Sequence, residues 1–188
     1  ILAVLIVAFI TLSFGTAAQA ISEFAIPAEV LEVAESGVTM LQSHMSSNPE
    51  KWGFQSVDEI ENLILGKGYY VNFIDFEKLE NFSGDKISDL FASDMFEKWE
   101  FTLDLNGIPK VFLTVGYEDG AYRIIHYGGN AESFGIAKNR MSYQQSDSAD
   151  IQANEILVDI GGKYCFISGD MENVVLVDST IMSSRNMG

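Results

Sequence analysis

The sequence has 188 residues, and its 27 Asp and Glu against 11 Lys and Arg give a formal net charge of −16. A negative field of this size repels phosphate backbones and anionic lipid headgroups, which argues against nucleic-acid binding and against stable membrane association of the mature chain. Cys165 is the single cysteine, so a disulfide within the chain is excluded.

The first 20 residues have the pattern of an export signal. Residues 1–14 are almost continuously apolar, and small residues follow, with Ala18 and Ala20 at the positions that a signal peptidase reads. We expect cleavage after Ala20 and secretion of a protein that begins at Ile21, in the extracellular space or the cell envelope. An uncleaved membrane anchor is the alternative.

The rest of the chain is expected to form one α+β domain with a C-terminal addition. We place the domain at 21–141, a polar loop or linker at 142–154, and a β segment at 155–188 that packs on the same domain. The sequence starts without Met and without a basic patch before the apolar run. It is therefore expected to be truncated at the N-terminus, and the C-terminus is open to the same interpretation.

Helices are predicted to precede the sheet. After Pro27, apolar residues recur at helical spacing to about residue 46, and they are Val30, Ala34, Val38, Leu41 and Met45. The segment 56–59 has the capping-box pattern and predicts a second helix that ends near Gly66, with Ile60, Leu63 and Ile64 on one face.

A strand and a third helix should follow. Aromatic and β-branched residues predict a strand at 69–76. Ile87, Leu90, Phe91 and Met95 then have helical spacing, with Ser83 or Asp85 available as a cap.

The region 97–127 predicts a three-stranded antiparallel meander. Apolar and polar residues alternate in 99–105 and in 111–117, as in strands that are covered on one side. Glu100 and His126 fall on the opposite, less buried face. The residues expected on the shared apolar face are Trp99, Phe101, Val111, Leu113, Val115, Ile125 and Tyr127.

The turn sequences predict the register of this meander. Asn-Gly at 106–107 suggests a two-residue loop, but that loop would pair Thr102 with Val111 and oppose the polar and apolar faces. A three-residue loop with a left-handed Gly107 keeps one apolar face, and Gly120 repeats the chemistry. The predicted pairs are Phe101 with Val111, Trp99 with Leu113, Leu113 with Ile125, and Val111 with Tyr127.

Three further elements are predicted after the meander. Asn130 can cap a short helix that runs to about Met141, and a hairpin should fold about Gly161-Gly162 within 155–168. A last strand is expected at 174–177.

This order of elements resembles a cystatin-type arrangement, in which one helix packs across a four-stranded antiparallel sheet. Three runs of the predicted meander carry a narrower resemblance, and they are Trp99-Glu100-Phe101-Thr102-Leu103, Asn106-Gly107-Ile108-Pro109-Lys110 and Tyr122-Arg123-Ile124-Ile125. In these runs the chain is similar to the prodomains of secreted bacterial cysteine peptidases of the streptopain and staphopain kind, and also to uncharacterised exported proteins of Gram-positive bacteria. The resemblance implies a non-catalytic domain that inhibits or escorts a peptidase.

The residues with catalytic chemistry form no recognisable set. Cys165 lies in a predicted strand, faces Val158 and is expected to be an inert core residue. His44 and His126 have no third ligand at zinc spacing, and neither a nucleophile elbow nor a P-loop is present. We therefore predict no catalytic residue, no metal and no cofactor.

Two weaker possibilities stay open at this stage. The segment 128–130 could present backbone amides to an anion, although a strand-to-helix turn explains it as well. Asp147, Asp150, Asp170 and Glu172 could bind a calcium ion weakly, although their spacing is not that of an EF-hand.

The leading hypothesis for the function is a secreted binding or inhibitory module for a protein partner, such as a peptidase or a cell-surface protein. The alternative is an extracellular hydrolase with an acidic pair that the sequence does not locate.

Overall fold

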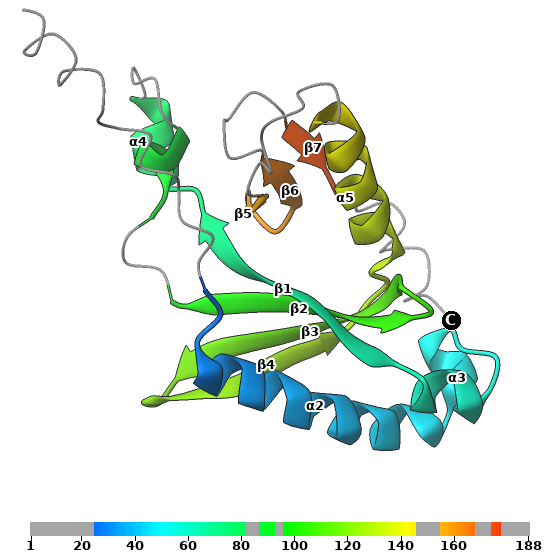
Figure 1. The fold of residues 1–188 in the computed structure, drawn as a ribbon. Coiled ribbons are helices and arrows are strands. Elements are labelled where there is room, and N and C mark those ends of the chain that lie inside the picture. The colour runs from blue at the N-terminus through cyan, green and yellow to red at the C-terminus, as the bar shows by residue number, and fades with distance from the viewer. Residues whose placement is uncertain (1–24, 82–86, 93–95, 146–154, 168–173, 178–188) are drawn as a thin grey trace, which may run out of the picture.

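The computed structural model describes residues 25–81, 87–92, 96–145, 155–167 and 174–177, and it has the predicted α+β class. Helical elements precede and interrupt the strands (Figure 1). The helical elements are α2 (Ala28–Ser46), η1 (Pro49–Trp52), α3 (Val57–Glu61), α4 (Phe76–Glu80), η2 (Ile87–Leu90) and α5 (Glu132–Gln145). The strands are β1 (Ile64–Phe73), β2 (Lys98–Leu105), β3 (Ile108–Glu118), β4 (Ala121–Gly128), β5 (Ile156–Asp159), β6 (Tyr164–Ile167) and β7 (Val174–Leu176).

One seven-stranded sheet organises the described chain, in the order β4-β3-β2-β1-β5-β6-β7. Strand β1 joins its two halves, because its first part pairs antiparallel with β2 and its last part, 71–73, pairs parallel with β5. All other strand pairs are antiparallel. The C-terminal strands thus continue the sheet that the meander begins.

Helix α2 covers one face of the meander, as the apolar spacing predicts. The buried residues of α2 pack against the face of β2, β3 and β4 that is turned toward the helix (Figure 1). Gly37 allows a close approach, since a β-carbon there would lie 2.6 Å from Cδ1 of Ile124. The buried residues of α2 are Val30, Ala34, Gly37, Leu41 and Met45.

The other face of the meander is covered too, which corrects the prediction of a sheet buried on one side only. Helix α5 and the β5–β7 strands lie over this second face, and Phe134 of α5 packs against Phe112 of β3 with ring centroids 5.5 Å apart (Figure 1). Glu100 is 2% exposed rather than a surface residue. Sequence alternation marks two faces but does not show that a second layer will cover the polar one.

The first hairpin uses the two-residue turn Asn106-Gly107, with φ of 53° and 77°. A bulge then leaves Lys110 without a partner in the strand ladder and shifts the register, so that Phe101 pairs with Leu113. The predicted partner, Val111, was wrong by two residues. A shift of two residues preserves the alternation of faces, so the predicted apolar face of β2 and β3 is correct.

The second hairpin repeats this solution. It turns at Asp119-Gly120, with φ of 51° and 82°, and a bulge leaves Ile125 as the extra residue. Ile124 therefore packs in the core beneath α2, whereas Ile125 lies beside Gly116 on the other face. The predicted place of Ile125 on the shared apolar face was wrong. His126 is exposed, and its partner in β3 is Thr114.

Predicted boundaries before the meander were wrong for the second helix, the third helix and the strand between them. The strand β1 spans Ile64–Phe73 rather than 69–76, and Phe76 begins the helix α4. The second helix, α3, ends at Glu61 rather than near Gly66, because β1 already begins at Ile64. The apolar side chains assigned to that helix are divided between the core and the strand, with Ile64 61% exposed. In the described part of the third predicted helix, η2 is a single turn of 3-10 helix, and Ser83, Asp85 and Met95 lie outside the described residues.

The elements after the meander agree better with the sequence patterns. Asn130 accepts a hydrogen bond from the backbone amide of Glu132 at the start of α5. The hairpin about Gly161-Gly162 pairs Val158 with Cys165, as predicted. Helix α5 runs to Gln145, into the predicted linker.

Several expectations fall outside the described residues. These are the export signal at 1–20 with its cleavage site, the rest of the linker at 146–154, and the calcium candidates Asp147, Asp150, Asp170 and Glu172. Within the described ranges, the helices are too short or too polar to cross a bilayer.

Candidate functional site

Polar side chains from four strands meet inside the molecule and form what we call the buried polar network. Glu100 accepts hydrogen bonds from the hydroxyls of Thr114, at 3.0 Å, and Tyr164, at 2.6 Å. The Lys98 ammonium donates to the Tyr164 hydroxyl at 2.6 Å and lies 3.8 Å from Oδ2 of Asp159. The network thus links β2 and β3 to the β5–β6 hairpin.

The strand registers explain why these residues meet. Glu100 is paired with Thr114 across the β2–β3 ladder, and Lys98 lies on the same face because it is two positions away in the strand. Tyr164 is paired with Asp159 at the turn end of the β5–β6 hairpin. Once β5 pairs with β1, this hairpin end comes to lie over Glu100.

Burial perturbs the ionisation of the network. Desolvation raises the pKa of Glu100, and the charge of Asp159 acts in the same direction, while Tyr164, Lys98 and Thr114 oppose the shift. Desolvation also raises the pKa of Tyr164, with the Glu100 charge as the next cause. Tyr164 is therefore a neutral hydrogen-bond donor at physiological pH.

A carboxyl group with a raised pKa beside a second carboxylate is the chemistry of an acid–base pair. Glu100, however, is 2% exposed, and each of its oxygens already accepts a hydrogen bond from a side chain of the protein. A substrate would have to displace these partners. The hydrogen bonds of Glu100 therefore connect the two halves of the sheet inside the protein.

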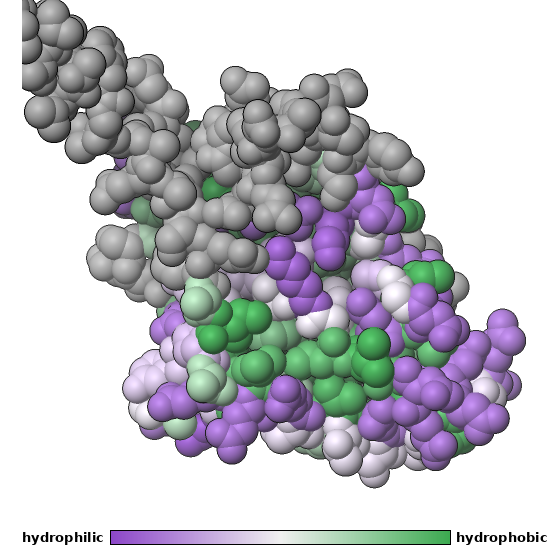
Figure 2. Space-filling view, in the orientation of Figure 1, coloured by the Kyte–Doolittle hydropathy of each residue, from purple (hydrophilic) through white to green (hydrophobic). Residues whose placement is uncertain are grey.

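A second feature lies at the surface, where β3 turns into β4. We call Tyr117 and Tyr122 the aromatic end. Tyr117 is 46% exposed, and its ring meets that of Tyr122 edge to face with centroids 5.1 Å apart. Figure 2 shows an apolar patch over the middle of the strands and a more polar surface toward the β3–β4 turn.

Glu97 organises this aromatic end. Its Oε1 accepts hydrogen bonds from the Tyr122 hydroxyl, at 2.7 Å, and from Nε1 of Trp99, at 3.2 Å. The hydrogen bond to Glu97, followed by burial, raises the pKa of Tyr122 to about 12. Tyr122 therefore stays neutral and presents a fixed ring at the surface.

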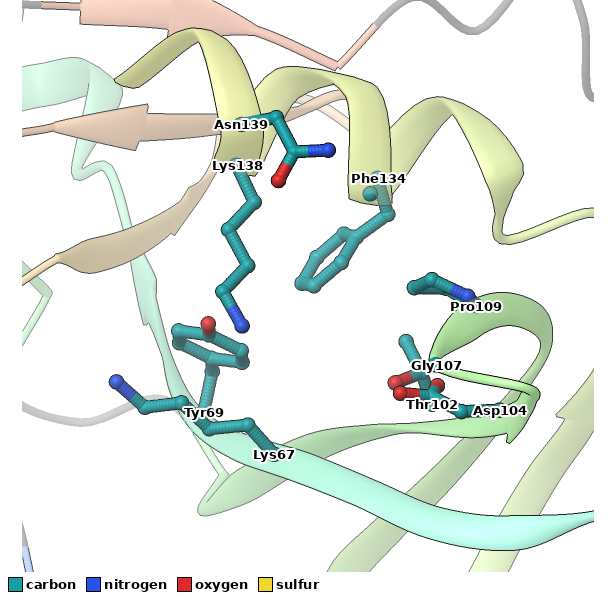
Figure 3. A pocket seen from close by; sticks show the side chains of 10 residues that line it. Lys67, Tyr69, Thr102, Asp104, Gly107, Pro109, Phe134, Lys138 and Asn139 are labelled. Atoms are coloured by element: carbon teal, nitrogen blue, oxygen red, sulfur yellow. The ribbon is translucent and has the colours of Figure 1, made fainter. Parts of the chain in front are cut away.

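A third feature is a small hollow of about 90 Å³ at the opposite end of the meander. It is bounded by β1, the β2–β3 turn and α5 (Figure 3). Asp104 contributes the single carboxylate among the side chains that line it, and Lys67 and Lys138 contribute amines. This hollow therefore does not hold the two close carboxylates that a glycosidase would need.

Cys165 lies where the sequence predicts, opposite Val158 and fully buried. Burial, followed by the charge of Asp159, raises the pKa of its thiol to about 11. The thiolate that nucleophilic chemistry requires is therefore disfavoured at neutral pH.

The two histidines do not come together with Cys165. His44 is at the end of α2, where its ring lies edge-on to Trp52 and Tyr127 at 5.7 and 5.8 Å. His126 is an exposed residue of β4. In the described ranges, no three His, Cys, Asp or Glu side chains are grouped closely enough to hold a metal ion.

The segment Gly128-Gly129-Asn130 serves as the turn from β4 into α5. Both glycines have positive φ, of 118° and 75°, and Asn130 caps the helix. Its residues have the conformations that a tight strand-to-helix turn needs.

Sequence reasoning missed Glu100, Tyr164 and Asp104. Glu100 occupies a polar position in an alternating strand, so its pattern is that of a solvent-facing residue. A pairing between distant strands decides its burial, and no local signal encodes that pairing.

No protein-family model, curated protein or solved structure matches this chain.

Proposed function

We propose that this chain is a non-catalytic binding protein that contacts a partner protein with its aromatic end. The observation that carries the proposal is the exposure of Tyr117 beside an anchored Tyr122. Aromatic side chains supply much of the free energy at protein interfaces, because they bury a large area at a small cost in conformational entropy. An anchored ring also loses less freedom on binding.

Charges around the aromatic end restrict the partner. Glu29, at the start of α2, is near enough to act electrostatically on Tyr122, and Figure 1 places this helix end beside the β3–β4 turn. Glu118 and Asp119 are exposed at the turn itself. Arg123 is the basic residue that follows Tyr122 in the sequence, and its Nη1 lies 3.6 Å from Oδ2 of Asp119. The complementary surface is therefore apolar with a basic rim.

The class of partner that we propose is a secreted cysteine peptidase. A helix across an antiparallel sheet, as formed by α2 and β1 to β4, is the arrangement whose resemblance implies peptidase inhibition or escort. The second layer of α5 and β5–β7 is an addition to that arrangement. Among the described residues, this layer does not cover the β3–β4 turn or the start of α2, which lie at one end of the sheet (Figure 1).

Inhibition and binding of a papain-type bacterial peptidase test the proposal. We expect saturable inhibition, and we expect Tyr117→Ser to weaken it by at least about tenfold, because the exposed ring would be lost from the interface. Ile108→Ser is the matched control, since Ile108 is 52% exposed in the same strand at its other end. Equal effects of both substitutions, or no binding to any peptidase of this class, would overturn the proposal.

The alternative, a hydrolase, has one specific pair to test. Glu100 and Asp159 act electrostatically on each other within the buried polar network. The burial of Glu100 and its two internal hydrogen bonds favour binding over hydrolysis as the function. Glycoside turnover by the wild type that is abolished in Glu100→Gln would reverse this preference.

A further inference from the structure

The hollow at the β2–β3 end contains an unsatisfied carboxylate oxygen. Oδ1 of Asp104 is buried and accepts no hydrogen bond from the described residues. Such an atom costs free energy when it is desolvated, and native proteins leave few of them without a reason. The atom therefore marks a place where a donor from outside the chain would be stabilised.

Asp104 lies where β2 and β3 leave the regular ladder. Its partner in β3 is Pro109, and the bulge begins at this pair. Gly66 of β1 leaves space beside it, because a β-carbon at Gly66 would lie 2.8 Å from Oδ1 of Asp104 and would collide with Oγ1 of Thr102. Thr102 and Asp104 both line the hollow, on the side away from Lys138 (Figure 3).

The opposite wall carries a positive charge. Figure 3 shows the Lys138 amine reaching into the hollow from α5, across from the oxygens of Thr102 and Asp104, with the Phe134 ring between the two walls. An ammonium has three N–H donors, so Lys138 can bind an acceptor in the hollow in addition to its contacts within the chain. Phe134 supplies an apolar surface for the carbon atoms of a ligand.

We infer that this hollow binds a small zwitterion of the amino-acid class. The ligand ammonium donates to Asp104 and Thr102, and the ligand carboxylate accepts from Lys138. The hollow has room for several water molecules or for one molecule of this size.

The overall charge supports a zwitterion over a simple anion. The net charge of −16 repels an anion before it reaches Lys138, whereas a ligand of zero net charge experiences no net repulsion. A simple cation would satisfy Asp104 but would meet the amine of Lys138. Only a ligand that carries both an ammonium and a carboxylate complements Asp104 on one wall and Lys138 on the other.

This inference is independent of the proposed partner protein. The hollow includes Gly107 of the β2–β3 turn, whereas the aromatic end includes Tyr117 beside the β3–β4 turn, at the other end of β3. Loss of peptidase binding in Tyr117→Ser would leave zwitterion binding unchanged. Failure of one proposal is therefore distinguishable from failure of the other.

Calorimetric titration and thermal melts with glycine, alanine and β-alanine test the inference, with acetate and methylammonium as half-ligands. We expect saturation by at least one zwitterion at about 10 mM or below and weaker binding of both half-ligands. Asp104→Asn and Lys138→Met should each weaken the zwitterion at least about tenfold. The matched controls, Asp119→Asn and Lys163→Met, change exposed residues outside the hollow and should bind within about twofold of the wild type.

Circular dichroism of each variant verifies its fold, and Lys138→Met keeps the test valid if Asp104→Asn fails to fold. Absence of saturation by any of the zwitterions would overturn the inference. Equal binding by Asp104→Asn, Lys138→Met and the wild type would do so too, as would binding of acetate as strong as that of glycine.

Discussion

The hydroxyl of Tyr164 donates a hydrogen bond of 2.6 Å to Oε2 of Glu100 and so joins β6 to β2 across the interior. The same hydroxyl accepts a hydrogen bond from Lys98. Tyr164 is therefore the link between the partly buried cation of Lys98 and the buried carboxyl group of Glu100. The stability of the fold should depend on this link and on the ionisation of Glu100.

Glu100→Gln should stabilise the protein at neutral pH. The folded-state pKa of Glu100 is raised, chiefly by burial, so the folded state binds more protons than the unfolded state between the ordinary Glu pKa and the raised one. The free energy of unfolding contributed by Glu100 consequently falls as the pH rises through that window. Urea denaturation over a pH series should show the largest gain in the free energy of unfolding for Glu100→Gln at neutral pH, and the gain should shrink as the pH falls toward the ordinary Glu value of about 4.5.

Glu118→Gln, at an exposed residue of β3, serves as the control for a change of net charge. Its stability relative to the wild type should vary little over the same pH series. A Glu100→Gln protein that is less stable than the wild type at neutral pH would mean that ionised Glu100 is a net stabilising member of the network.

Tyr164→Phe should lower the free energy of unfolding by about 1–3 kcal/mol, because it leaves both Glu100 and Lys98 without one buried hydrogen-bond partner. Tyr117→Phe removes a hydroxyl from a residue that is 46% exposed and should stay within about 0.5 kcal/mol of the wild type. Chemical denaturation measures both differences. Similar values for the two variants would show that the Tyr164 hydroxyl contributes no more than a surface hydroxyl.

The sequence predicted which residues share a face of the meander better than it predicted which residues pair between the strands. Alternation placed Trp99, Phe101 and Leu113 correctly in the core beneath α2. The actual turns have two residues, and each hairpin restores the apolar face with a bulge, at Lys110 and at Ile125. Where a bulge falls depends on packing between layers, so alternation within single strands did not locate it.

The buried polar network could not be predicted for a related reason. Glu100 and Tyr164 are 64 residues apart, and the parallel pairing of β1 with β5 brings them together. Short-range periodicity contains no information about such a crossover. Cys165 was predictable because its neighbours come from the adjacent hairpin strand, where the turn fixes the pairing.

Cys165 should react with a thiol reagent only when the protein opens. It is fully buried, and burial raises its pKa to about 11, so little thiolate exists at neutral pH. Labelling kinetics in native buffer should follow the opening rate and accelerate in urea. Lys163→Cys provides an exposed reference thiol in the same hairpin, and it should react in a separate fast phase.

Cys165→Ser should lower the free energy of unfolding by about 1–2 kcal/mol, because a hydroxyl without an assured partner replaces a packed sulfur. Any activity of the protein should survive the change. Loss of activity at unchanged stability would assign Cys165 a functional role.

Gly107→Val and Gly120→Val should both destabilise the fold, although both sites are exposed turn residues. Their φ values are 77° and 82°, and a β-carbon at either site would have no heavy atom within 4 Å, so the cost comes from the backbone alone. A β-branched residue in the left-handed region costs at least about 1–2 kcal/mol. Gly107→Asn is the matched control, because Asn adopts this conformation more readily. The melting temperature should be highest for the wild type, lower for Gly107→Asn and lowest for Gly107→Val. Equal melting temperatures for all three proteins would mean that the turn relaxes to another conformation. In that case the two-residue loop does not determine the register of β2 and β3.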